Sequence, residues 1–153
     1  MKGKVLVVGA GIFGMTTSVE LARLGYQVTL HEELGDVMEC ASGINQYRLH
    51  RGYHYPRSLE TVLTCIEGEK QFSTTYPEAV IDSTNNYYCI SKEKSLTSGH
   101  EFEKLCKRNN LNFRTLFPNE VNKDNISNSY LVDESLFDPM KLKESIYKKL
   151  KIK

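Results

Sequence analysis

The 153-residue chain carries no strong excess of charge of either sign. Its 20 lysines and arginines nearly balance 19 aspartates and glutamates, which gives a formal net charge of +1. Proteins that bind nucleic acid or anionic membranes concentrate positive charge on one surface. The near balance therefore favours a small neutral or zwitterionic ligand and predicts no nucleic-acid partner.

The chain also lacks the patterns of a metal site, a disulfide framework and a membrane span. Four scattered cysteines (Cys40, Cys65, Cys89 and Cys106) form no C-x-x-C pair, which is typical of reduced cytoplasmic thiols. No run approaches the about 18 to 20 apolar residues needed to cross a bilayer. An apolar run at Val5 to Val8 is interrupted by glycines, so we expect no signal peptide, no transmembrane segment and a cytoplasmic location.

The first 32 residues predict a strand, a turn, a helix and a second strand, in this order. Residues Lys4 to Val8 (KVLVV) form a short apolar run without alternation, which predicts a central strand buried on both faces of a parallel sheet. The positions that follow keep helical spacing: Ile12, Met15, Val19 and Ala22. Gly25 should end this helix, and Gln27 to His31 should form the second strand.

The rest of the chain predicts further helices and strands. The expected elements are a helix after Ser58 to about Tyr76, a strand Asn86 to Ser91, a helix after the Ser98 and Glu101 capping box to about Asn109, a weaker strand Ser129 to Val132, and a helix started by Asp138 and Pro139. A change of composition near Pro77 to Tyr88 suggests two domains, residues 1–80 and 81–153.

Three glycines stand in a G-x-G-x-x-G pattern (GAGIFG) between the first strand and the first helix. Gly9 permits a tight turn, Gly11 lets the backbone approach a pyrophosphate, and Gly14 lets helix and strand pack closely. Free N–H groups at the start of the helix then point at the phosphates. We predict a dinucleotide site formed by Gly9, Ala10, Gly11, Ile12, Phe13 and Gly14.

An acidic residue completes this fingerprint. Glu32 follows the second strand, 18 residues beyond Gly14, where a carboxylate can accept hydrogen bonds from both hydroxyls of an adenosine ribose. Its charge disfavours the 2′-phosphate of NADP, and Glu33 is included in the predicted site. The alternative interpretation is a glycine-rich turn in an α/β sheet with Glu32 merely solvated.

The segment from Val5 to Ser58 resembles the amino-terminal part of the D-amino-acid oxidase and glycine oxidase superfamily of FAD-dependent oxidoreductases. The resemblance rests on GAGIFG, on the strand that ends in His31 and Glu32, and on Ala41-Ser42-Gly43-Ile44-Asn45, which is similar to the family's A-S-x-x-N segment. Residues 59–153 resemble the family only in the order of their elements.

The resemblance implies an α/β fold, a Rossmann-like FAD-binding βαβ unit in residues 1–80 with part of an α+β substrate (cap) domain in residues 81–153. FAD would be the cofactor, with its pyrophosphate at the three glycines and its ribose at Glu32. Ser42 and Asn45 would lie along the flavin side, where they can hydrogen-bond without adding charge. Some relatives join the flavin covalently near Cys40, for which a buried inert thiol is the alternative.

The implied reaction removes a hydride from a carbon that bears an amine and delivers it to flavin N5, so the substrate is expected to be an amine or an amino acid. The stretch Tyr47 to Arg57 (YRLHRGYHYPR) concentrates arginine, histidine and tyrosine. An arginine there could clamp a substrate carboxylate. The candidate catalytic residues are Arg48, His50, Tyr53 and His54; the alternative is a solvated polar loop or one that contacts flavin phosphates.

Family members of full length are more than twice as long, so a fragment or a shortened form is expected. Its sheet should have an unpaired edge and bare apolar surface. Three functions stay open at this point. They are an FAD-dependent amine or amino-acid oxidoreductase, an NAD-dependent oxidoreductase with the same fingerprint, and a truncated, non-catalytic dinucleotide-binding module.

Overall fold

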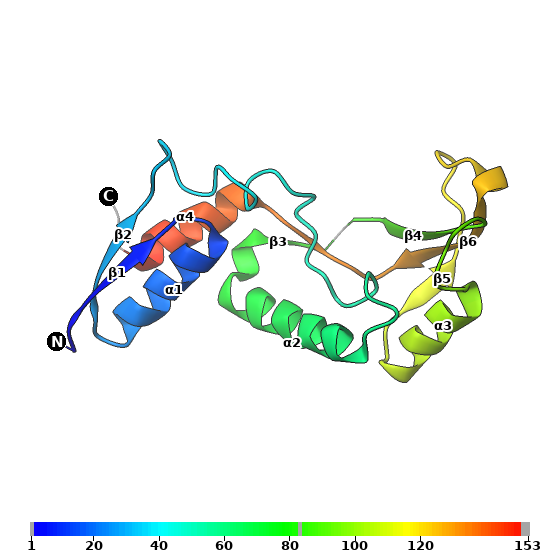
Figure 1. The fold of residues 1–153 in the computed structure, drawn as a ribbon, viewed down its shortest axis with the longest axis horizontal. Helices are drawn as coiled ribbons and strands as arrows, with labels where there is room; N and C mark the ends of the chain where they lie inside the picture. The colour runs from blue at the N-terminus through cyan, green and yellow to red at the C-terminus, as the bar shows by residue number, and fades with distance from the viewer. Residues whose placement is uncertain (1, 83, 151–153) are drawn as a thin grey trace. The chain divides into compact units, whose positions relative to one another are not determined.

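The computed structural model describes residues 2–82 and 84–150, which form two compact units (Figure 1). The first unit contains the chain up to Tyr47 and again from Phe137, and the second contains Arg48–Leu136. The boundary expected between residues 80 and 81 does not coincide with this division. Residues 48–80 belong to the second unit, and the last helix returns to the first unit and packs against its first helix.

The first unit has the predicted order of strand, glycine turn, helix and strand. Its elements are β1 (Lys4–Val8), α1 (Ile12–Arg23), β2 (Gln27–His31) and α4 (Pro139–Leu150). β1 pairs in parallel with β2, from Lys4 opposite Gln27 to Val8 opposite His31. α1 connects the two strands, so this unit is a Rossmann-like βαβ unit extended by α4.

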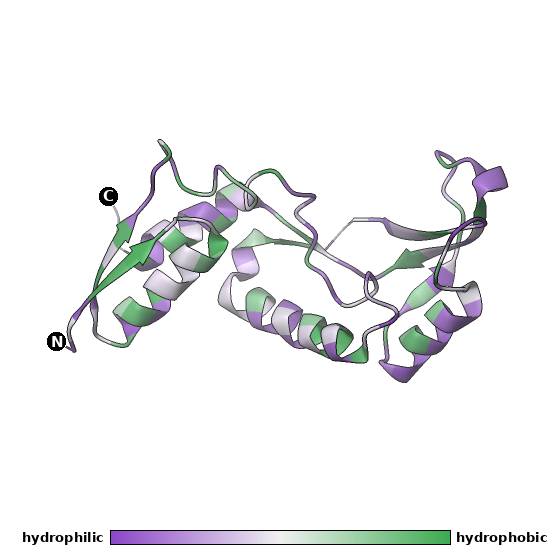
Figure 2. Ribbon diagram, in the orientation of Figure 1, coloured by the Kyte–Doolittle hydropathy of each residue, from purple (hydrophilic) through white to green (hydrophobic). Residues whose placement is uncertain are grey.

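One face of β1 is open to solvent. Val5 and Val7 are half-buried, whereas Leu6 and Val8 are 58% and 80% exposed. Figure 2 shows most of β1 as hydrophobic. The expectation of a central strand buried on both faces is wrong for the described residues, in which β1 pairs with β2 alone. The bare edge and apolar surface expected of a partial sheet are present.

The helix ends of the first unit follow the predicted signals. Gly25 follows the C-cap residue Leu24 of α1 and has a positive φ of 91°, which glycine adopts without a steric penalty. Asp138 caps α4, because its Oδ1 accepts hydrogen bonds from the N–H groups of Met140 (2.9 Å) and Lys141 (3.2 Å). Leu142 and Ile146 are fully buried, as their helical spacing predicts.

The second unit contains a three-stranded antiparallel sheet in the order β4-β6-β5. Its elements are α2 (Leu59–Thr75), a 3₁₀ turn (Pro77–Ala79), β3 (Val80–Ile81), β4 (Asn86–Ser91), α3 (Gly99–Arg108), β5 (Phe113–Thr115), a 3₁₀ turn (Lys123–Asn125) and β6 (Ile126–Val132). β7 (Leu136–Phe137) follows at the boundary of the units. The capping box of Ser98 and Glu101 is present, and Ser58 caps α2 as predicted.

Aromatic and aliphatic side chains fill the core of the second unit. The buried cluster consists of Tyr53, Val62, Ile90, Phe102, Cys106, Leu111, Tyr130 and Val132. Phe102 of α3 stacks on Tyr130 of β6 with ring centroids 4.8 Å apart, which joins the helix to the sheet. Burial raises the pKa of the Cys106 thiol to about 12, so this cysteine stays protonated and unreactive at neutral pH.

Neither a membrane-spanning helix nor a metal cluster occurs in the described part of the chain. Among residues 2–82 and 84–150, none of the helices combines the length and the apolar character that a bilayer span needs. Nor does a group of three histidine, cysteine or acidic side chains come close enough in these residues to hold a metal ion.

Candidate functional site

The glycine turn joins β1 to α1 with a geometry that only glycine allows. Gly9 has a φ of 93°, and its N–H donates to the carbonyl of His31 (2.8 Å), which ties the turn to β2. A methyl group on Gly14 would overlap the carbonyl oxygen of Gly9. The third glycine of the pattern therefore permits the close contact of helix and strand that the sequence predicted.

The amino-terminal end of α1 presents backbone N–H groups beside a hydroxyl. The N–H of Ile12 donates to Ser42 Oγ (3.0 Å), and a methyl group on Gly11 would lie 3.3 Å from the same oxygen. Within residues 2–82 and 84–150, the N–H groups of Gly11, Phe13 and Gly14 have no acceptor. These donors, at the positive end of a helix dipole, suit a phosphate.

Glu32 lies at the mouth of this turn. Its carboxylate accepts hydrogen bonds from the N–H groups of Ala10 (2.6 Å), Glu33 (2.9 Å) and Leu34 (3.1 Å). The bond from Ala10, followed by that from Leu34, lowers the pKa of Glu32 below its usual value, so the group is ionised at neutral pH. The side chain of Glu33 is exposed, and its contribution here is its N–H.

A pocket of about 210 Å³ adjoins the start of α1. It is lined by Ile12, Phe13, Ala41, Ser42, Asn45 and Phe137. The predicted residues of the glycine turn and of the A-S-x-x-N segment thus lie together. Asn45 shapes its own loop, because its Nδ2 donates to the carbonyl of Ala41 (3.0 Å) and its Oδ1 accepts from the N–H of Tyr47 (2.6 Å). The sequence missed Phe137, for which no local pattern exists.

Helix α4 holds the loop that carries Ser42 and Asn45. Lys143 forms an ion pair with Asp36, and the Tyr147 hydroxyl donates to Asp36 Oδ1 (3.2 Å). The hydrogen bond from Lys143 is the main reason that the pKa of Asp36 lies below its usual value. Cys40 of this loop is exposed, so the interpretation of a buried thiol is wrong.

The residues of the first unit fit the ADP part of FAD. Nothing lies within 4 Å of a methyl group added to Gly9, three N–H groups at the start of α1 have no acceptor among the described residues, and an ionised carboxylate stands beside the turn. Ser42 and Asn45 add polar groups without charge along the adjoining pocket.

In the second unit, Arg48 and His50 meet at Glu134. The Glu134 side chain is fully buried and forms an ion pair with Arg48, and its Oε1 lies 3.4 Å from His50 Nδ1. It also accepts hydrogen bonds from the N–H of Arg51 (3.0 Å) and the hydroxyl of Tyr88 (3.1 Å). Two predicted catalytic residues therefore share one carboxylate partner.

The electrostatics of Glu134 balance burial against hydrogen bonds. Burial raises the pKa of Glu134, but the neighbouring His50, the hydrogen bond from the Arg51 N–H and the charge of Arg48 outweigh it, so the pKa lies below its usual value. The carboxylate is therefore ionised at neutral pH. The sequence missed Glu134, because nothing in the local Asp-Glu-Ser run distinguishes it from a surface acid.

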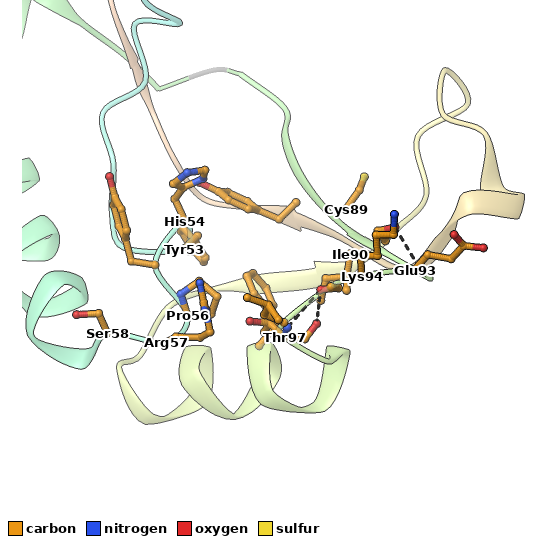
Figure 3. Close-up of a pocket in the computed structure, with 16 residues that line it drawn as sticks. Tyr53, His54, Pro56, Arg57, Ser58, Cys89, Ile90, Glu93, Lys94 and Thr97 are labelled. Carbon is orange, nitrogen blue, oxygen red and sulfur yellow. Dashed lines mark hydrogen bonds between the residues drawn. The ribbon is translucent and has the colours of Figure 1, made fainter.

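The other two candidates, Tyr53 and His54, lie in different surroundings. Tyr53 belongs to the core, and its hydroxyl donates to the carbonyl of Asn112 (2.6 Å). Burial raises its pKa, so Tyr53 stays neutral. His54 is exposed, stacks on His50 with centroids 5.5 Å apart, and lines a second pocket of about 590 Å³ (Figure 3).

Comparison with known proteins gives a family match over most of the chain. Residues 4–141 match the family described as FAD dependent oxidoreductase. The chain is 34% identical over 108 residues to the FAD-dependent monooxygenase kojA of Aspergillus flavus, which covers 67% of this chain and 25% of that protein. It is 30% identical over 128 residues to the FAD-dependent monooxygenase FPY4 of Fusarium mangiferae. This alignment covers 84% of this chain and 35% of that protein.

Solved structures show the same fold at low sequence identity. Glycine oxidase from Geobacillus kaustophilus superposes with a TM-score of 0.76 at 13% identity, over 95% of this chain and 43% of that chain. L-amino acid deaminase from Proteus vulgaris superposes with a TM-score of 0.69 at 19% identity, over 96% of this chain and 38% of that chain. The chain therefore spans less than half the length of the relatives that it matches.

Proposed function

This chain belongs to the FAD-dependent oxidoreductase family, and we propose that it serves the oxidation of an amine or an amino acid, as the amino-terminal part or a shortened form of such an enzyme. The cofactor of the family is FAD, which decides against the NAD-dependent alternative. When bound, FAD accepts the hydride that leaves the carbon next to the substrate nitrogen. The nitrogen loses a proton, and water hydrolyses the resulting imine.

The observation that carries the proposal is the glycine turn with Glu32 at its mouth. The free N–H groups of Gly11, Phe13 and Gly14 would hold the pyrophosphate of FAD, and Ser42 would assist at the start of α1. Glu32 is ionised and can accept hydrogen bonds from the ribose hydroxyls. We propose no contact with FAD for the side chains of Ala10, Ile12 and Glu33.

On the substrate side, the proposal assigns roles to charged residues of the second unit. Arg48 and His50 are oriented by Glu134, and His54 lines the larger pocket. An arginine of this stretch can hold a substrate carboxylate, and the two histidines can exchange a proton with the substrate nitrogen. Tyr53 is left out of this set, because its hydroxyl is committed to the core.

The test is whether the chain takes up FAD through Glu32. We expect purified protein to retain a yellow chromophore absorbing at about 450 nm, or to acquire it from added FAD. Glu32→Ala should weaken FAD binding about tenfold through loss of the ribose contact. Glu144→Ala, which changes an exposed acid of α4, is the matched control. Wild-type protein that stays colourless in excess FAD would refute the proposal.

A monooxygenase is the second candidate function, favoured by the names of the two sequence relatives. Such an enzyme inserts one atom of O₂ into its product and needs a reductant, whereas an oxidase releases hydrogen peroxide. Turnover under ¹⁸O₂, with peroxide measured in parallel, separates the two. A non-catalytic module would bind FAD without substrate-dependent bleaching at about 450 nm.

A further inference from the structure

The second unit contains a pocket, lined in part by His54, whose ligand the glycine turn and the Glu134 cluster do not identify. Its volume is about 590 Å³, within the range of roughly 300 to 1,000 Å³ typical of small-molecule sites. The walls come from residues 53–58, from β4, from residues 91–97 and from Phe102 of α3. All of these belong to the second unit, so the pocket does not depend on how the two units are arranged.

Arg57 of this pocket has a guanidinium without an acidic partner among the described residues. Of the three arginines in the stretch Tyr47 to Arg57, Arg48 pairs with Glu134 and Arg51 pairs with two other acids of the same unit. Arg57 forms no ion pair with any residue of 2–82 or 84–150, and it lines the pocket. Of these three arginines, Arg57 is therefore the one whose guanidinium is available to an anionic ligand.

The pocket offers a firm apolar wall beside this charge. Ile90 and Phe102 are almost fully buried and contribute to the lining. Tyr88 lies between them and the loop, with its hydroxyl bonded to Glu134 (3.1 Å) and the Arg48 guanidinium 4.6 Å above its ring. These contacts fix the orientation of the tyrosine ring, so an aromatic or branched ligand would meet a preformed surface.

The loop that carries Arg57 is also held in place. Gly52 has a φ of 99°, and a methyl group on it would approach Val62 of α2 to 2.9 Å. Two turns follow, in which the N–H of Tyr55 donates to the carbonyl of Gly52 (3.1 Å) and that of Ser58 to the carbonyl of Tyr55 (3.1 Å). Arg57 thus stands on a loop with a defined course, directly before the capping residue of α2.

We infer that this pocket binds a small monocarboxylate with an aromatic or branched apolar body, whose carboxylate contacts Arg57. Figure 3 shows Arg57 and His54 toward one end of the pocket and the oppositely charged Glu93 and Lys94 toward the other, so the positive charge that no acid balances lies at the Arg57 end. If the ligand is the substrate, the substrate is an amino acid with a large apolar side chain. That identification rests on the proposed function, whereas the binding does not.

The experiment titrates the ¹⁵N-labelled full chain with 3-phenylpropionate and follows the resonances of the lining residues. The amide 3-phenylpropionamide lacks the charge, and propionate lacks the ring. We expect 3-phenylpropionate to bind more tightly than either analogue. Arg57→Met should weaken its binding about fivefold and leave the affinity for the amide unchanged, because a partly exposed ion pair is lost. Arg57→Lys should lose less affinity for 3-phenylpropionate than Arg57→Met, because lysine keeps the positive charge.

The matched control is Arg114→Met, which removes an exposed arginine of β5 outside the pocket and should leave binding unchanged. Equal affinity for acid and amide, equal binding by wild type and Arg57→Met, or shifts outside the pocket would overturn the inference. FAD uptake is measured on the same preparations. A chain that binds 3-phenylpropionate but no FAD refutes the proposed function alone, and a chain that binds only FAD refutes the pocket alone.

Discussion

The two units build their candidate sites from different material. In the first unit, backbone N–H groups of adjacent residues converge at one helix end, and one acid stands at the end of the paired strand. In the second unit, side chains converge on Glu134, which lies 86 positions beyond its partner Arg48. A site made of backbone groups can be predicted from a short segment of sequence, whereas a cluster of side chains forms only after distant segments have packed.

The sharpest way to break the second site is to remove its central carboxylate. Glu134→Ala leaves the half-buried Arg48 without its ion-pair partner and should lower the free energy of unfolding by about 3 kcal/mol. Urea denaturation measures the loss. Glu93→Ala, an exposed acid of the same unit, should change stability by less than about 0.5 kcal/mol. Equal losses in both variants would show that Glu134 does not organise its cluster.

The corresponding change in the first unit targets the backbone itself. Gly14→Ala places a methyl group against the carbonyl oxygen of Gly9 and should cost about 2 to 3 kcal/mol, together with most of the FAD affinity. Hydrogen exchange should report faster exchange in β1 and β2. Gly35→Ala is the control, because nothing lies within 4 Å of the added methyl group. Unchanged FAD uptake by Gly14→Ala would contradict the close-packing role of this glycine.

A smaller effect should follow from removing the cap of α4. Asp138→Ala removes the acceptor of two N–H groups and should destabilise the first unit by about 1 kcal/mol. The thermal midpoint of the chain measures this, and Asp138→Asn should recover part of the loss, because asparagine also caps helices. A full loss in Asp138→Asn would indicate that the charge, and not the hydrogen bonds, matters.

The smallest expected effect is on the pH dependence of stability. The folded pKa of Glu32 lies below its usual value of 4.5, so its contribution to stability is present at neutral pH and is lost as the pH falls through the folded pKa. Between about pH 5 and pH 3, Glu32→Gln should therefore lose less stability than wild type. Glu33→Gln, whose side chain accepts no hydrogen bond in the described chain, should follow the wild-type curve. Identical slopes for wild type and Glu32→Gln would contradict the role of the Ala10 bond.

Local signals predicted most of the helices, and tertiary packing decided the rest. Ser58, Ser98 and Asp138 marked three helix starts correctly, because a cap is formed within one turn. β5 has three residues, too few to show a period of two. The exposure of Leu6 could not be read from KVLVV either, because an entirely apolar run has no alternation that reveals an open face.

In the candidate site, the same distinction separates predicted from missed residues. The glycine turn, Glu32 and the Ser42 loop were predicted from spacing and resemblance, and the structure brings them together. Tyr53 was selected for its chemical type, but its ring is required by the core. Glu134 was missed because only the folded chain brings it to Arg48.

The open face of β1 has a consequence for the colloidal behaviour of the protein. Leu6 and Val8 place aliphatic groups directly in water, next to a strand edge whose amides can pair with another chain. Concentrated solutions should scatter light through contacts at this stripe long before either unit unfolds. Additives that solvate aliphatic groups should keep such solutions clear, whereas changes of ionic strength should not.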